Sequence, residues 1–344
     1  MKKYVLFLGG LILAIAAVIY ARNSHFEINE LPKEVRTISK VSPTPVPFAE
    51  LTIPYLREKQ YKGMLGERRL YQSRGSYNSY LTSYTSDSFK INGLLTIPTT
   101  DEPTDGYPAI VFIHGYIPPT QYRTTEKYDD YVHYLARNGF VVFKIDLRGH
   151  GESEGQPGGA YYSPDYVVDT LNAYAALRRS DFVDANKIGL WGHSMAGNVV
   201  MRSMSARPDI PAGVIWAGAV YTYEDMRTYG IDDNSYVRPP SSAPRQRSRE
   251  MLFAQMGEPN LESEYWKLVS PVSYLSELKG AVQIHHAVND DVVSIEYSRN
   301  IEQLAKEASA DIRLVEHSSG GHNMSGQAFV SAMQGTVDFF NEKL

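Results

Sequence analysis

A serine that could act as a nucleophile stands in the segment Leu190-Trp191-Gly192-His193-Ser194-Met195-Ala196-Gly197. The residues before it predict a buried strand, and a helix is expected directly after it. A strand-to-helix turn this tight forces Ser194 into a strained conformation and requires small neighbours. The strain exposes the hydroxyl, and the helix N-terminus favours negative charge nearby. Ser194 is therefore the candidate nucleophile, with an ordinary turn serine as the alternative; Ala196 adds one methyl group where glycine is usual.

A serine hydroxyl attacks poorly unless a base removes its proton. His322 is the candidate base, because it lies in a glycine-rich loop directly after a strand predicted to end at Glu316. The other histidines considered are less suitable by position. They lie within a strand, at the end of one, or beside the serine, where a structural role is expected: His193, His285, His286 and His317.

An imidazole base needs an acid that fixes its tautomer and stabilises its charged form. Two aspartates follow the strand predicted at 282–287, in the segment Asn289-Asp290-Asp291-Val292-Val293. Either could serve. Asp290 is favoured because it comes first after the strand, whereas Asp291 would more naturally cap the next turn.

Acyl transfer also needs donors for the negative charge that develops on the carbonyl oxygen. The backbone N–H of Met195, at the start of the helix, is one candidate. The other is the backbone N–H of Tyr116, in the loop after the strand 109–113, where Gly115 lets the backbone approach closely.

The elements that must position these residues alternate between strands and helices. Such alternation predicts an α/β fold with a mostly parallel sheet covered on both faces, and ligands bind at the carboxyl ends of its strands. An antiparallel pair, 80–84 and 91–97, precedes the parallel strands. These are predicted at 109–113, 140–145, 187–191, 213–220, 282–287 and 312–316, with helices at 166–178 and 327–340 and helices beginning at 195 and 294.

Composition shifts divide the chain into three parts. Residues 1–22 are interpreted as a membrane anchor or signal segment, 23–69 as a proline-containing tether and lead-in, and 70–344 as the catalytic domain. Within that domain, 221–270 break the alternation and are interpreted as an inserted lid. A disordered excursion is the alternative.

The N-terminal segment predicts export. Lys2 and Lys3 precede an uncharged run, 4–20, which is near the lower limit for a helix that spans a bilayer. Paired lysines before the run would keep the N-terminus in the cytoplasm and place the catalytic domain outside. Secretion after cleavage is the alternative, because 14–16 have the small-x-small form of a cleavage site.

Composition excludes several classes of function. The net charge is −5 with no basic block, which argues against a nucleic-acid partner. The chain has no cysteine, so disulfides, thiolate metal sites and a cysteine nucleophile are excluded. The histidines lack metal-ligand spacing, and no phosphate-binding glycine pattern follows a strand, so neither a metal nor a cofactor is expected.

These segments together resemble the α/β-hydrolase superfamily, and within it the dienelactone-hydrolase-like esterases and the catalytic domains of prolyl-oligopeptidase-type serine peptidases. The resemblance rests on the Ser194 turn and on the segments 112–116, 146–153, 289–293 and 320–322. It implies an α/β-hydrolase fold, and the chain order Ser, Asp, His is the one expected there. In the segment 146–153 we interpret Asp146, Arg148 and His150 as structural, with a buried acid near the guanidinium that holds the loop.

The resemblance implies a serine hydrolase that cleaves carboxylic esters or related small acyl substrates. Prolyl-oligopeptidase-type enzymes usually carry a β-propeller before the catalytic domain, and about fifty tether residues cannot form one. A serine-type peptidase acting on small peptides or acylated amino acids is the alternative. A hydrolase-fold protein that only binds partners is a third hypothesis, although such proteins usually lack a triad residue.

Overall fold

The computed structural model describes residues 47–236 and 243–344. The expected membrane segment, 1–22, lies outside the described residues, as does the tether up to residue 46. Within the two described ranges, no helix is both long and apolar enough to cross a membrane.

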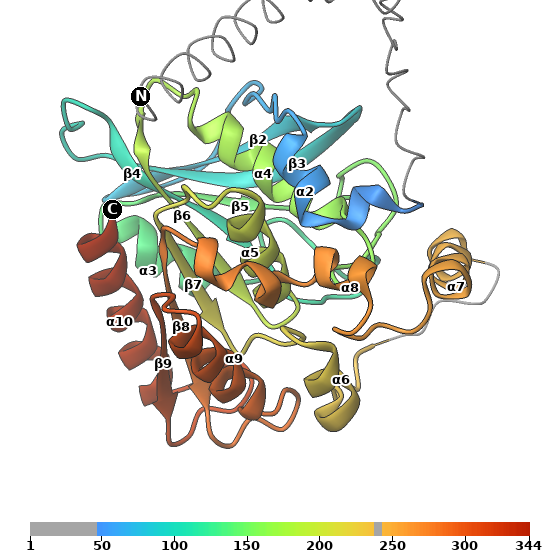
Figure 1. The fold of residues 1–344 in the computed structure, drawn as a ribbon. Helices are drawn as coiled ribbons and strands as arrows, with labels where there is room; N and C mark the ends of the chain where they lie inside the picture. The colour runs from blue at the N-terminus through green and yellow to red at the C-terminus, as the bar shows by residue number, and fades with distance from the viewer. Residues whose placement is uncertain (1–46, 237–242) are drawn as a thin grey trace, which may run out of the picture. The chain divides into compact units, whose positions relative to one another are not determined.

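A nine-stranded sheet forms the centre of the fold (Figure 1). Its first three strands are antiparallel, and the third pairs antiparallel with β5, which begins a parallel set of six. The order across the sheet is β1-β2-β3-β5-β4-β6-β7-β8-β9. The strands are β1 (Arg69–Arg74), β2 (Tyr77–Ser86), β3 (Phe89–Pro98), β4 (Tyr107–Ile113), β5 (Val141–Ile145), β6 (Val183–His193), β7 (Ala212–Trp216), β8 (Ala281–Ala287) and β9 (Ile312–His317).

Helices cover both faces of the sheet, so two hydrophobic cores form. One core lies between the sheet and α2, α4, α5 and α9, and the other between the sheet and α3 and α10. Parallel strands buried on both faces are near-continuously apolar, as all of β5 and β7 are buried here. The bounds are α2 (Ile53–Glu58), α3 (Asp129–Arg137), α4 (Asp165–Leu177), α5 (Ala196–Ala206), α9 (Glu296–Glu307) and α10 (Gln327–Lys343).

The predicted fold class is confirmed. Among the strands that differ from the sequence prediction, β6, predicted at 187–191, begins four residues earlier, at Val183. β1 was not predicted: it is an exposed edge strand, so no buried alternate side chains mark it. β7 was predicted at 213–220 but ends at Trp216. Ala217 and Val220 have φ of 48° and 58°, which no strand accommodates. Their apolar side chains are nevertheless buried, which explains the longer prediction.

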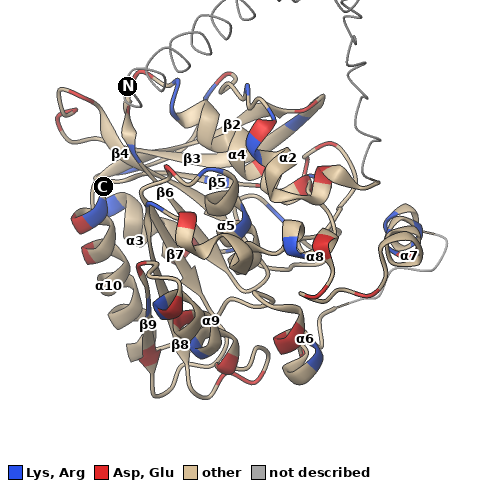
Figure 2. Cartoon of the chain, in the orientation of Figure 1, with Lys and Arg blue, Asp and Glu red and all other residues tan. Residues whose placement is uncertain are grey.

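The segment 221–270, interpreted as a lid, lies between β7 and β8, and its described residues, 221–236 and 243–270, form helices and no strand. They hold α6 (Tyr223–Tyr229), α7 (Pro244–Met256) and α8 (Glu264–Val269), and a 3-10 helix, η2 (Pro271–Glu277), leads into β8. In Figure 1, α7 stands to the right of the sheet. Charges of both signs occur on α6, α8 and α10 (Figure 2).

The described part of the lead-in, 47–69, packs against the sheet's helices. It contains η1 (Ala49–Leu51) and α2, whose Ile53 and Leu56 are fully buried. Arg202, buried in α5, donates hydrogen bonds to the carbonyl oxygens of Leu51, Ala160 and Ser163. This cation therefore ties the lead-in to a loop before α4.

Candidate active site

Ser194 occupies a strained turn between β6 and α5. Its φ is 55°, a left-handed value that is costly for a residue with a side chain. The backbone N–H of Ser194 donates to the Trp216 carbonyl oxygen at 2.8 Å, which holds the turn against β7. A Cβ on Gly192 would lie 2.8 Å from Val200 Cγ2 and 3.0 Å from the Ala196 carbonyl oxygen, so only glycine fits before the turn.

The structure brings His322 and Asp290 together, although 32 positions separate them in the chain. Nδ1 of His322 lies 2.8 Å from Oδ2 of the aspartate. The other carboxylate oxygen accepts the backbone N–H groups of Val292 and Val293, both at 2.9 Å. Asp291, the alternative acid, is exposed. Asp290 therefore has the position that an orienting acid requires.

A second imidazole, which the sequence interpretation passed over, shares this carboxylate. Nε2 of the fully buried His286 lies 3.1 Å from Oδ2 of Asp290 and 3.0 Å from the Val293 carbonyl oxygen. Its Nδ1 lies 2.7 Å from Ser298 Oγ. The only sequence signal was the position of His286 at the carboxyl end of the strand before the aspartate.

Hydrogen bonds keep Asp290 ionised despite its burial. Burial acts to raise the pKa of this carboxyl, but hydrogen bonds from His286, His322 and the Val293 N–H outweigh it and hold the pKa well below its ordinary value. An ionised acid is what stabilises an imidazolium while a proton is held on the base.

His193, the residue before Ser194, contacts His322. Nε2 of His193 donates to the backbone carbonyl oxygen of His322 at 2.9 Å, and the two ring centroids are 4.7 Å apart. Among the hydrogen bonds of the described ranges, none joins the Ser194 hydroxyl to the His322 ring. Such bonds are often long without substrate and tighten in the reacting complex.

The two expected oxyanion donors lie at the same edge of the sheet. Met195 is the N-cap of α5, and N–H groups at a helix start have no acceptor within the helix. Tyr116 follows β4 in a loop fixed one residue earlier, where the Gly115 N–H donates to the Tyr128 hydroxyl at 3.0 Å. The ring of Tyr116 packs against Tyr236, with centroids 5.4 Å apart.

The sequence and fold of this chain are similar to those of known peptidases and esterases. The family described as "Serine aminopeptidase, S33" matches residues 107–235, which run from β4 past the Ser194 turn into the segment interpreted as a lid. Among curated relatives, the uncharacterized peptidase YtmA of Bacillus subtilis is 22% identical over 265 residues, covering 75% of this chain and 92% of the relative.

Two solved structures show the same fold. Dipeptidyl peptidase 4 of Porphyromonas gingivalis superposes with a TM-score of 0.59 at 21% identity, covering 78% of this chain and 36% of that one. Acetyl xylan esterase 1 of Thermoanaerobacterium sp. JW/SL YS485 superposes with a TM-score of 0.58 at 17% identity, covering 83% and 90%. The shared part is thus about a third of the peptidase and most of the esterase.

The chain has the α/β-hydrolase fold and is a serine hydrolase.

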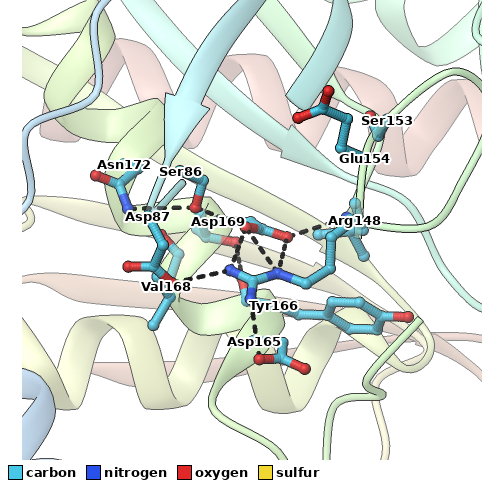
Figure 3. Close-up of polar contacts among 12 residues, drawn as sticks. Ser86, Asp87, Arg148, Ser153, Glu154, Asp165, Tyr166, Val168, Asp169 and Asn172 are labelled. Atoms are coloured by element: carbon cyan, nitrogen blue, oxygen red, sulfur yellow. Dashed lines mark hydrogen bonds and ion pairs between the residues drawn. The ribbon is translucent and has the colours of Figure 1, made fainter. Parts of the chain in front are cut away.

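In this serine hydrolase the loop after β5 is fastened by a buried ion pair (Figure 3). Arg148 donates to both carboxylate oxygens of Asp169 on α4, at 2.7–3.1 Å, and to Asp165 at 3.0 Å. The acid that holds the guanidinium therefore comes from α4. Asp146, in the loop itself, accepts instead from the hydroxyls of Tyr122 at 2.6 Å and Thr124 at 2.5 Å.

His150, in the same loop, is buried against the loop 114–128 after β4, named the oxyanion loop for its expected donor Tyr116. Its Nδ1 lies 3.1 Å from the Leu147 carbonyl oxygen, and its ring packs edge-on against His114. Burial lowers its pKa, which keeps the ring neutral. Within the described ranges of this serine hydrolase, no group of three potential metal-ligating side chains occurs.

Proposed function

We propose that this serine hydrolase cleaves carboxylic esters or related acyl substrates through Ser194, His322 and Asp290. The observation that carries the proposal is the 2.8 Å contact between His322 and Asp290 beside a nucleophile turn with a φ of 55°. The fold match to acetyl xylan esterase 1 extends over most of that protein, which supports an ester substrate.

The proposed reaction has two halves. Ser194 Oγ attacks the substrate carbonyl while Nε2 of His322 accepts its proton, and the same proton then passes to the leaving alcohol. Water next attacks the acyl-enzyme, again with His322 as base, and the departing serine oxygen takes the proton back. Asp290 holds the imidazole by Nδ1 and stabilises it while it is charged.

In both halves the carbonyl oxygen becomes negatively charged. The proposed donors are the backbone N–H groups of Met195 and Tyr116, which come from the start of α5 and from the loop after β4. Preorganised donors of this kind commonly contribute about 2.7–4 kcal/mol of transition-state stabilisation each. The Met195 N–H also lies at the favourable end of the α5 helix dipole.

A peptide or acylated amino-acid substrate is the second candidate. The match to the peptidase YtmA, which covers 92% of that relative, favours it. The chemistry is unchanged except for the leaving group, an amine in place of an alcohol. The lid, 221–270, is the proposed source of the selectivity between the two.

Paired kinetics test both candidates on the full chain. We expect hydrolysis of p-nitrophenyl esters of short acids, with much slower release from aminoacyl-p-nitroanilides. Ser194→Ala should abolish the activity and also the labelling by a fluorophosphonate probe. The reverse preference would establish the peptidase candidate, and a wild-type chain that neither turns over nor labels would support a binding protein and contradict the proposal.

We also propose that the enzyme works outside the cytoplasm, tethered through residues 1–22. The support is sequence composition alone: two lysines before an uncharged run. Alkaline phosphatase fused after residue 46 should be active in a bacterial host, and replacing the run 4–20 by a polar segment should abolish that activity. An inactive first fusion would contradict the proposed location.

A further inference from the structure

Tyr128 connects two parts of the site and is strained. It precedes α3 and has a left-handed backbone, with φ 63° and ψ 21°. Such a conformation costs about 1–3 kcal/mol and persists only where the surroundings impose it. The Tyr128 hydroxyl lies 3.0 Å from the Gly115 backbone nitrogen and 2.8 Å from Nδ1 of His193. The strained residue thus joins the oxyanion loop to the residue before Ser194.

The fixed ends of this hydrogen-bond chain determine where its protons lie. The Gly115 N–H can only donate, and the His322 carbonyl oxygen, 2.9 Å from Nε2 of His193, can only accept. Burial, and next the neighbouring His322, lowers the pKa of His193 to about 3, so its ring is neutral and carries one proton. That proton lies on Nε2. Nδ1 is therefore an acceptor, and it receives the phenol proton of Tyr128.

Gly115 leaves room for both partners. A Cβ at this position would lie 2.9 Å from the Tyr128 hydroxyl oxygen, closer than real Cβ atoms approach, and a tight 3.1 Å from Nδ1 of His193. Tyr131, one turn along α3, donates to the Asn323 carbonyl oxygen at 2.8 Å. The start of α3 therefore contacts both the oxyanion loop and the loop that carries His322.

We propose that Tyr128 and His193 are positioning residues, whose hydrogen-bond relay holds the oxyanion loop and the His322 loop in fixed places on either side of Ser194. The inference rests on the proposed function and adds two residues that need not touch substrate. Because oxyanion donors and base act most strongly in the transition state, cutting the relay lowers turnover more than substrate binding.

Tyr128→Phe removes the middle of the relay and keeps the ring. In the full chain we expect kcat on p-nitrophenyl butyrate to fall about tenfold, with KM within about twofold of wild type. The affinity for a trifluoromethyl ketone, which forms a tetrahedral adduct with the serine, should fall by the same factor as kcat/KM. Tyr134→Phe is the matched control, since the hydroxyl of this α3 tyrosine donates to Gln334 at the surface. Its kinetics should equal those of wild type.

Two substitutions at His193 each break one hydrogen bond of the relay. His193→Gln breaks the bond to Tyr128, and His193→Asn breaks the bond to the His322 carbonyl oxygen. Glutamine keeps an amide donor near the Nε2 position, and asparagine keeps an acceptor near Nδ1. Both should lower kcat. Because Tyr128→Phe and His193→Gln break the same link, the double variant should be little slower than the slower single variant. Multiplied effects would contradict a shared relay.

The outcomes separate this inference from the proposed function. If Tyr128→Phe matches Tyr134→Phe while Ser194→Ala is inactive, the relay is overturned and the proposed function stands. If the wild-type chain shows no serine-dependent hydrolysis, both fall. Should Tyr128→Phe fail to fold, the His193 variants decide, and wild-type kcat in both would overturn the relay.

Discussion

One oxygen of Asp290 accepts hydrogen bonds from two imidazoles. The N–H of His286 that points at it also points at the Val293 carbonyl oxygen, which can only accept, so this Nε2 must carry a proton. In a neutral His286, Nδ1 then accepts from Ser298. The Asp290 carboxylate is therefore held by His286, whose side chain is fully buried. The side chain of His322, by contrast, is 13% exposed.

Asp290→Asn should lower kcat by about 10³–10⁴-fold, because an amide can donate to Nδ1 and favour the wrong tautomer of His322. The measurement is kcat on p-nitrophenyl butyrate. Asp291→Asn is the matched control from the adjacent, exposed position, and it should keep nearly full activity. An equal loss in both variants would contradict the choice of Asp290.

His286→Leu should lower both stability and turnover. It removes one donor from the catalytic carboxylate and leaves Ser298 without its buried partner, which together should cost about 1–3 kcal/mol of unfolding free energy. Urea unfolding measures the first effect and steady-state kinetics the second. His286→Gln, which retains a donor near Nε2, should recover most of the turnover. A leucine variant with wild-type kcat would show that Asp290 keeps its position without the hydrogen bond from His286.

At the scale of elements, hydrogen bonds with β5 and with the turn after it hold the loop 114–128, which connects β4 and α3. Lys144 is fully buried in β5 and donates to the Lys127 carbonyl oxygen at 2.6 Å. Asp146 follows two residues later and accepts the hydroxyls of Tyr122 and Thr124. The position of this loop thus depends on two buried charged side chains, Lys144 in β5 and Asp146 directly after it.

Lys144 should make stability depend on pH in the alkaline range. Burial lowers the pKa of Lys144 to about 8 from its ordinary 10.5. Between these values the unfolded chain binds more protons than the folded one, so this residue's contribution makes stability rise with pH, by at most about 3 kcal/mol. Below about pH 8 both states are protonated and the contribution is flat.

Lys144→Met should remove this contribution. Urea unfolding at about pH 7.5 and pH 10, in wild type and variant, isolates it because other groups cancel in the difference. Lys62→Met, at an exposed position, should leave the wild-type pH dependence unchanged. The same rise in Lys144→Met as in wild type would show that the lysine does not cause it.

The sequence predicted those elements whose patterns are local. β4, β5 and β8 are apolar runs, and each lies within two residues of its predicted bounds. The edge strand β1 lacks such a pattern, and β7 ends at a backbone change that its apolar sequence does not mark.

In the candidate site, too, residues with a local sequence pattern were predicted and residues without one were not. Ser194, Asp290 and His322 were identified because each follows a strand in a distinctive turn. Tyr128 and His286 were passed over because their roles depend on partners that only the fold brings near. The Tyr128 hydroxyl meets a histidine 65 positions away, and no local pattern indicates that contact.

At the scale of the whole molecule, the catalytic core includes residues that precede its first strand. Leu56 of α2 is fully buried against α5 and neighbouring helices. Leu56→Ala should lower the free energy of unfolding by about 2–5 kcal/mol, as measured by urea denaturation. Tyr55→Ala, at the adjacent and 43% exposed position, should change it by less than about 1 kcal/mol. Equal effects would mean that α2 is not part of the cooperative unit.

The insertion between β7 and β8 has a consequence for how such enzymes diversify. Because the described residues of this insertion, 221–236 and 243–270, add helices and no strand, their replacement by an unrelated helical segment need not disturb the sheet register. If the proposed role of the lid in selectivity holds, selectivity and chemistry are encoded in separate segments of the chain. We then expect a chimaera that exchanges this insertion alone to gain a new substrate range and to keep the same reaction.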